Sequence, residues 1–209
     1  ADALVRTGQY KRILIVGAEM HSRGLDLTTA GRDVSVLFGD GAGAAIIGPS
    51  DDDTGILSVH LHADGNFAKE LWIEGPGCSF HPFRYRPGMY EEGLLYPKMN
   101  GKAVFTHAVR RMPEVLGEAL KQNGKAISDL DLLVPHQANL RINEAVAKGM
   151  GISEDKVFNT IQRFGNTTAA TLPIGLSEAV AQGKLKKGML LGMVAFGSGF
   201  TWGSALVKW

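Results

Sequence analysis

Hydrophobic residues along the chain follow two kinds of pattern. Short β-branched or alternating runs predict strands, whereas apolar residues spaced three and four positions apart predict helices. The predicted strands cover residues 12–16, 33–38, 44–47, 56–62, 130–134, 157–160, 189–196 and 201–207. The predicted helices cover residues 101–124, 138–150 and 167–182. This alternation predicts an α/β fold with a mostly parallel sheet covered by helices.

The longest predicted helix begins at Gly101 and ends at Gly124. Its apolar residues fall on one face, at positions such as Val104, Ala108 and Leu116. Pro113 lies inside this pattern. Because proline cannot donate a backbone hydrogen bond, we expect a kink or a break there.

Residues 63–99 interrupt the periodic pattern with several prolines and glycines and with seven aromatic residues. A long segment of this kind in a compact domain is usually a functional loop or an interface. The chain is therefore expected to have three parts. Residues 101–209 form one complete half-unit, residues 63–100 form a long loop, and residues 1–62 are the end of another half-unit. The first six residues resemble the end of an amphipathic helix, so we expect them to continue from a preceding segment.

Composition narrows the classes of function. Lys and Arg together number 22 and Asp and Glu number 21, so no basic surface for nucleic acid is expected. The longest apolar runs are too short to span a membrane, and the first residues do not form a signal peptide. A single cysteine, Cys78, excludes an internal disulfide and a cysteine-based metal site, and favours a cytoplasmic setting.

Two polar residues follow predicted strands. His136 lies between a buried strand and a helix, and so does Asn166. Ligands and catalytic groups collect at the carboxyl ends of strands in α/β sheets. His136 taken alone could be a structural histidine, and Asn166 could be a helix cap. Taken together, they form a pair of hydrogen-bond donors suited to a thioester or enolate oxygen that gains charge during a reaction.

A glycine pattern raises a different hypothesis. Gly39-x-Gly41-x-x-Ala44 follows a predicted strand and fits a relaxed dinucleotide-binding fingerprint. Residues 45–49 then form a β-like run that ends at a proline, so no helix N-terminus is predicted to hold a pyrophosphate. Close packing of two glycine-rich strands explains the pattern better.

Five segments, in this order, resemble those of β-ketoacyl-acyl-carrier-protein synthase III: F-G-D-G-A-G-A-A (38–45), H-L-H-A-D-G (60–65), V-P-H-Q-A-N-L-R-I (134–142), G-N-T-T-A-A (165–170) and A-F-G-S-G-F-T-W-G-S-A-L-V (195–207). The resemblance implies a thiolase-like fold with a complete C-terminal half-unit. It also implies decarboxylative condensation of an acyl-CoA primer with malonyl-acyl-carrier protein, which starts fatty acid or related polyketide synthesis. No metal or separate cofactor is implied, since acyl-CoA is a substrate.

The resemblance also implies roles for particular residues. His136 and Asn166 match the His and Asn of the family's Cys-His-Asn triad, and would stabilise the enolate formed from the malonyl group. The Gly197-Ser198-Gly199 turn would bring backbone N–H groups to the reacting carbonyl, although it could be only a tight hairpin. Arg141 and Lys148 would contact the acidic carrier protein, or belong to an ordinary solvated face. Arg32 would lie near the CoA nucleotide.

The nucleophilic cysteine of this family is expected upstream of Ala1, outside the 209 residues. Cys78 lies in the irregular segment, with no family motif around it, and is interpreted as a free thiol rather than the nucleophile. The chain alone is therefore predicted to be inactive in condensation. The family also implies a homodimer whose long loop helps wall the acyl tunnel. The alternative hypothesis is a non-catalytic subunit that pairs with an active partner.

Overall fold

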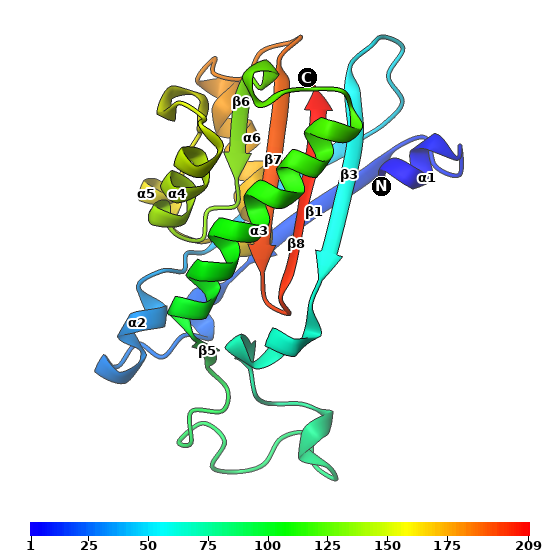
Figure 1. Cartoon of the computed structure of the whole chain (residues 1–209). Helices are drawn as coiled ribbons and strands as arrows, with labels where there is room; N and C mark the ends of the chain where they lie inside the picture. The colour runs from blue at the N-terminus through cyan, green and yellow to red at the C-terminus, as the bar shows by residue number, and fades with distance from the viewer.

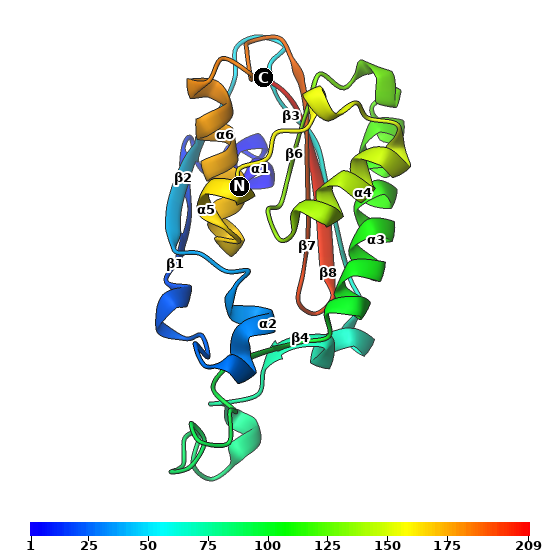
Figure 2. The ribbon, with the colours of Figure 1, turned by 90° about the vertical axis from the view of Figure 1, so that its left-hand side faces the viewer.

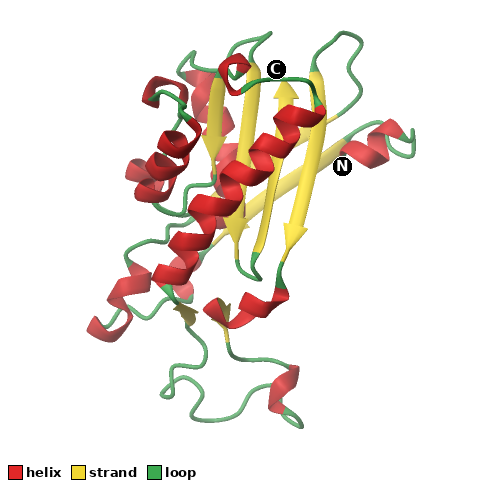
Figure 3. Cartoon of the chain, in the orientation of Figure 1, coloured by secondary structure: helices red, strands yellow, loops and turns green.

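The computed structural model describes all 209 residues. The strands are β1 (Ile13–Glu19), β2 (Gly41–Ile47), β3 (Gly55–Ala63), β4 (Leu71–Ile73), β5 (Pro97–Met99), β6 (Leu132–Pro135), β7 (Leu190–Gly197) and β8 (Thr201–Lys208). The α-helices are α1 (Asp2–Arg6), α2 (Arg32–Ser35), α3 (Gly101–Gln122), α4 (Leu140–Met150), α5 (Ile161–Phe164) and α6 (Thr171–Ala181). Figure 1 shows their arrangement, and Figure 3 separates helices, strands and loops by colour.

The elements are stacked in layers, which Figure 2 shows from the side. The antiparallel pair β1–β2 forms one outer layer, and α5 and α6 lie between it and a four-stranded sheet. Helices α3 and α4 cover the opposite face of that sheet. The larger hydrophobic core lies under α3 and α4 and includes Met112, Leu116 and Val194. The smaller core, which includes Val134 and Leu191, lies toward α6.

The four-stranded sheet has the order β3-β8-β7-β6, and only β6 and β7 run parallel. The prediction of a mostly parallel sheet is therefore wrong for this chain. A parallel pair needs a long crossover, and only the segment between β6 and β7, which contains α4 to α6, provides one. The connection between β7 and β8 is a three-residue turn, which permits only antiparallel pairing.

Helix α3 runs without a break through Pro113. The proline removes one backbone hydrogen bond, but the buried residues on both sides of it, including Ala108, Met112, Val115 and Leu116, pack into the same core or lie fully buried beside it. Burial of this continuous apolar face outweighs the missing bond. The break considered at this position therefore does not occur.

Residues 33–38 were expected to form a strand, and this prediction is wrong. Arg32–Ser35 is a helical turn, with Leu37 N–H bonded to the Val34 carbonyl. Val34, Leu37 and Phe38 are partly buried, whereas Val36 is exposed. That spacing of three and four residues is helical, and a short apolar run does not distinguish the two structures by itself.

Residues 157–160 are less regular than expected, and the segment 63–99 is more regular. Residues 157–160 contain only an isolated parallel bridge between Val157 and Leu133. The segment 63–99 contains the short antiparallel pair β4–β5 and the 3-10 helices Gly65–Glu70 and Cys78–Phe80. The three-part division at residues 62 and 100 stays a prediction, while β3 pairs along its length with β8 of the C-terminal region.

The glycines of β1 and β2 face the segment that carries Asn166. A Cβ atom on Gly17 would lie 2.6 Å from the carbonyl carbon of Ala169, and one on Gly43 would lie 2.9 Å from Pro173. Because β2 is followed by another strand and not by a helix, the chain lacks the helix N-terminus that a dinucleotide site requires. The glycine pattern therefore serves close packing.

No helix of the chain is both long and apolar enough to cross a membrane.

Candidate active site

The loop after β6 fixes the position of His136. Its backbone N–H donates to the carbonyl of Val194 on β7, over 2.7 Å. Its side-chain Nδ1 lies 2.7 Å from Oγ1 of Thr171, the first residue of α6. The ring is therefore held between the carboxyl end of the parallel strand pair and the beginning of a helix, as the sequence predicted for a residue at this edge.

The buried side chain of Gln137 stiffens the same loop. It is fully buried, and its Nε2 donates to the carbonyl of Pro135 over 2.7 Å. Its Oε1 accepts from the backbone N–H groups of Thr160 and Ile161, at 2.9 and 3.1 Å. These bonds tie the His136 loop to the beginning of α5. No local pattern in the sequence identifies Gln137 as important. Its role becomes visible only in the structure, where its buried amide is fully hydrogen-bonded next to His136.

Asn166 lies at the end of a second connection and is also buried. Its backbone N–H donates to the carbonyl of Leu37, and its own carbonyl accepts from Gly39 N–H. Its side-chain Oδ1 accepts from the backbone N–H of Thr168 over 2.8 Å. Because the amide oxygen is engaged in this way, the Nδ2 group is the end of the side chain that remains free to donate.

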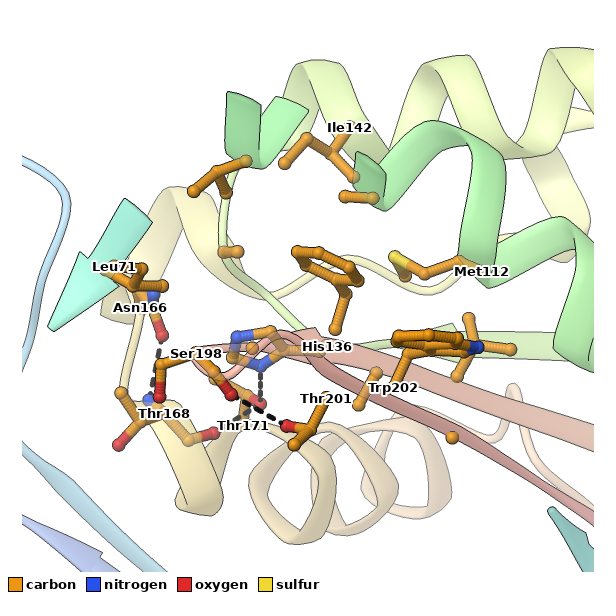
Figure 4. A pocket seen from close by; sticks show the side chains of 18 of the residues that line it. Leu71, Met112, His136, Ile142, Asn166, Thr168, Thr171, Ser198, Thr201 and Trp202 are labelled. Carbon is orange, nitrogen blue, oxygen red and sulfur yellow. Dashed lines mark hydrogen bonds between the residues drawn. The ribbon is translucent and has the colours of Figure 1, made fainter. Parts of the chain in front are cut away.

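Thr168 and Thr171 are site residues that the sequence analysis missed. Both belong to the turn that begins at Asn166, and Figure 4 shows them beneath Asn166 and His136 with the connecting hydrogen bonds dashed. Thr168 has a φ of +40°, a conformation that few residues other than glycine adopt. An asparagine whose side chain accepts from the N–H two residues later is a known local motif, which would have pointed to Thr168.

His136 and Asn166 line one cavity of about 1370 Å³. Most of the lining is apolar, including Met112, Ile142 and Phe196. A large apolar cavity with a few converging polar groups is typical of a site for a small organic ligand or an acyl chain. Met112 of α3 lies on one wall of the cavity, and His136 lies on the opposite wall, as Figure 4 shows.

The protonation state of His136 follows from its surroundings. Burial lowers the pKa of His136 to about 4, because the charged imidazolium loses hydration and no acidic side chain compensates it. The imidazole is therefore neutral at neutral pH and carries a single ring proton. Asn166 has no titrating group. Both side chains thus offer N–H donors without adding a charge to the cavity.

The turn between β7 and β8 lies partly at this cavity. Gly197 and Ser198 are among its lining residues, whereas Gly199 is not. Gly199 has a φ of +130°, so the turn requires glycine at this position. The predicted role of the turn as a donor of backbone N–H groups stays a prediction.

The predicted basic residues separate into two groups. Arg141 is an exposed residue of α4 and lies on the rim of the cavity. Lys148 is exposed on the same helix, about 10 Å farther along its axis, and does not line the cavity. Arg32 begins α2, is exposed, lies 3.8 Å from Asp33 and is also outside the lining.

Cys78 is exposed, in the 3-10 helix Cys78–Phe80, and does not line the cavity that contains His136 and Asn166. In Figure 1 this part of the chain belongs to the long loop that extends below the sheet and helices. No group of three or more His, Cys, Asp or Glu side chains in the chain could hold a metal ion.

Two family models match most of the sequence. Residues 1–65 match the model described as 3-oxoacyl-[acyl-carrier-protein (ACP)] synthase III, and residues 120–209 match the model of its C-terminal part. The chain belongs to this family. The resemblance that the sequence motifs predicted is thereby confirmed.

Individual relatives give the same result. A β-ketoacyl-[acyl-carrier-protein] synthase III of Xanthomonas campestris pv. campestris is 47% identical over 209 residues, which are 100% of this chain and 62% of that protein. The crystal structure of 3-oxoacyl-[acyl-carrier-protein] synthase III from Aquifex aeolicus superposes with a TM-score of 0.87 at 38% identity, covering 100% of this chain and 61% of the other. The priming β-ketosynthase of the R1128 polyketide pathway superposes at 0.84 with 33% identity, covering 98% and 59%.

These matches confirm the predicted α/β, thiolase-like fold. The chain spans about three fifths of the length of the curated relatives it matches.

Proposed function

We propose that this site carries the malonyl half of a decarboxylative Claisen condensation. In that reaction an acyl primer taken from acyl-CoA is extended by malonyl-acyl-carrier protein, the first carbon–carbon bond formation of fatty acid or related polyketide synthesis. The observation that carries the proposal is the pair of neutral donors, His136 and Asn166, on the wall of one largely apolar cavity. Membership of the synthase III family supports it.

The chemistry needs such a pair of donors. When the malonyl carboxylate leaves as carbon dioxide, the electrons of the broken C–C bond form an enolate, and negative charge develops on the thioester oxygen. Nε2 of His136 and Nδ2 of Asn166 would donate to that oxygen. In a largely apolar cavity, oriented donors of this kind stabilise developing charge far more than they would in solution.

The enolate carbon then attacks the carbonyl of the acyl group held as a thioester on a cysteine. The new C–C bond forms, the tetrahedral intermediate collapses, and the cysteine leaves as a thiolate. Cys78 does not fit this role, because it is exposed and outside the cavity of His136 and Asn166. The nucleophile is therefore assigned to a cysteine outside these 209 residues, and the chain alone is expected not to complete a condensation.

The proposed partners are the acyl carrier protein and acyl-CoA. Arg141, exposed on the cavity rim, is the best placed residue for the carrier protein, and Lys148 extends the basic face of α4. Arg32 is assigned to acyl-CoA more weakly, because it lies outside the cavity lining. The functional assembly is proposed to be a homodimer, as the family resemblance implies.

The experiment measures carbon dioxide release from a malonyl thioester, a step that needs the donors but not the nucleophile. Release above the uncatalysed rate is expected, with losses of about 10²-fold in His136→Ala and in Asn166→Ala. His81→Ala is the matched control, since His81 is exposed in the long loop and outside the cavity. No release by the unaltered chain, or equal release by all variants, would support the alternative of a non-catalytic subunit of a heterodimeric enzyme.

A further inference from the structure

The hydroxyl group of Thr171 contacts two acceptors. Its Oγ1 lies 2.7 Å from Nδ1 of His136 and 2.8 Å from the backbone carbonyl oxygen of Thr168. Thr171 is only 2% exposed, so no solvent competes for the hydroxyl. A threonine hydroxyl carries a single proton and can donate to only one acceptor at a time. The choice between the two acceptors decides which nitrogen of His136 carries the ring proton.

The two acceptors differ in the hydrogen bonds that they accept from other groups. The carbonyl of Thr168 already accepts the backbone N–H of Thr171, because Thr171 follows the 3-10 turn Thr168–Ala170. The ring of His136 makes no hydrogen bond other than the one to Thr171. If the hydroxyl donates to Thr168, Nδ1 must hold the ring proton and Nε2 presents a lone pair to the cavity. If it donates to Nδ1, Nε2 holds the proton.

We propose that Thr171 is a positioning residue whose hydroxyl donates to Nδ1 of His136 and holds the ring in the tautomer protonated at Nε2. The inference rests on the proposed function, which requires an N–H and not a lone pair at the growing negative charge. In Figure 4 the ring nitrogen that is not bonded to Thr171 faces the cavity.

The same turn would then orient both donors. Thr168 N–H occupies the oxygen of the Asn166 amide and leaves its NH₂ group free, while Thr171 O–H occupies Nδ1 of His136 and leaves Nε2–H free. Thr171 is three positions after Thr168, so a single turn of backbone orients two side chains, His136 and Asn166, that come from different connections.

The test is nitrogen-15 NMR of the imidazole rings in the purified protein. The chain has six histidines, and the His136 signals are those that disappear in His136→Gln. The expected result is a protonated Nε2 and an unprotonated, hydrogen-bonded Nδ1. A protonated Nδ1 would overturn the proposal. In Thr171→Val, which keeps the shape of the side chain, the Nδ1 signal should move to the position of a nitrogen without a hydrogen bond, and Thr171→Ser should restore it.

The catalytic consequence is measured separately. Carbon dioxide release should fall roughly tenfold in Thr171→Val, less than on loss of the donor itself, and should recover in Thr171→Ser. If the NMR signals behave as expected but His136→Ala releases carbon dioxide normally, the proposed function fails and the tautomer assignment stands. If Nδ1 is protonated while His136→Ala is impaired, the assignment fails and the function stands.

Discussion

The imidazole of His136 has a pKa near 6.5 in an unfolded chain and of about 4 in the folded one, because burial disfavours its charge. Between these values the unfolded state binds more protons. The contribution of the neutral ring to stability is therefore complete above pH 6.5 and is lost as the pH falls toward 4, about 3 kcal/mol in all.

Urea unfolding at pH 7 and pH 4.5 checks this. From the higher to the lower pH, the free energy of unfolding of the unaltered protein should fall by roughly 2 kcal/mol more than that of His136→Gln, which cannot titrate. Equal decreases in the two proteins would contradict the assignment of a neutral imidazole to the partly buried His136.

The thiol of Cys78 is expected not to take an acyl group from CoA. Because the thiol is exposed and outside the cavity, incubation of the chain with acetyl-CoA should give no acetyl adduct in the intact mass. Cys78→Ser should have the same mass profile and the same carbon dioxide release. An adduct that disappears in Cys78→Ser would show that Cys78 is reactive and that the active site has been placed incorrectly.

The sequence was sufficient for some residues of the site and not for others. His136 follows the buried strand β6, a position that local pattern alone reveals. Asn166 was also expected after a strand, but α5 precedes it, so only the family motifs, which include both residues, indicate it. Thr171 is five residues after Asn166, and its importance depends on a contact with a side chain 35 positions away. Contacts of that range depend on packing between α6 and the end of β6, which no local pattern encodes.

Among the secondary-structure elements, strands and helices with long or strongly periodic patterns were predicted well. Helices α3 and α4 and strands β3, β7 and β8 lie close to their expected bounds. The prediction for residues 33–38 failed because Val34, Leu37 and Phe38 suit a helical turn as well as a strand. The relative direction of the strands was also mispredicted, because it depends on which strands become neighbours. The chain pairs β3 with β8, two strands that are far apart in the sequence.

The loop before β2 packs closely against the end of α5. A Cβ atom on Gly39 would collide with the carbonyl oxygen of Phe164, a backbone atom that cannot turn aside. Gly39→Ala should therefore destabilise the protein by about 1–3 kcal/mol, as overpacking does. Gly149→Ala is the matched control. It lies in α4 with nothing within 4 Å of the added atom, and should be neutral or stabilising by up to about 1 kcal/mol.

Both variants are compared by their midpoints of denaturant unfolding. A Gly39→Ala protein as stable as Gly149→Ala would mean that the loop before β2 does not approach the carbonyl of Phe164 this closely. Loss of stability in both would point to a general effect of added methyl groups rather than to this contact.

The molecule as a whole has one conspicuous open surface. One face of β1–β2 packs on the segment of α6, and the other exposes Leu14, Val16 and Ile46, each at least 60% accessible. Leu14 and Ile46 are paired across the two strands, so these side chains form a continuous apolar patch. Patches of this kind in soluble proteins are normally covered. We expect this face to be covered in the working enzyme.

The isolated chain should therefore self-associate, and Val16→Lys should reduce the association measured by sedimentation velocity. Leu27→Lys serves as the control, because Leu27 is exposed but lies outside this patch. A chain that stays monomeric over a wide range of concentration would contradict this expectation, as would equal association of the two lysine variants.

The most direct test of the central claim is a crystal structure of the protein with a malonyl thioester analogue whose carboxylate cannot leave. The thioester oxygen is expected to lie about 2.7–3.1 Å from both Nε2 of His136 and Nδ2 of Asn166. An analogue bound in the same cavity with its thioester oxygen away from either donor would contradict the assignment of these two residues to the enolate.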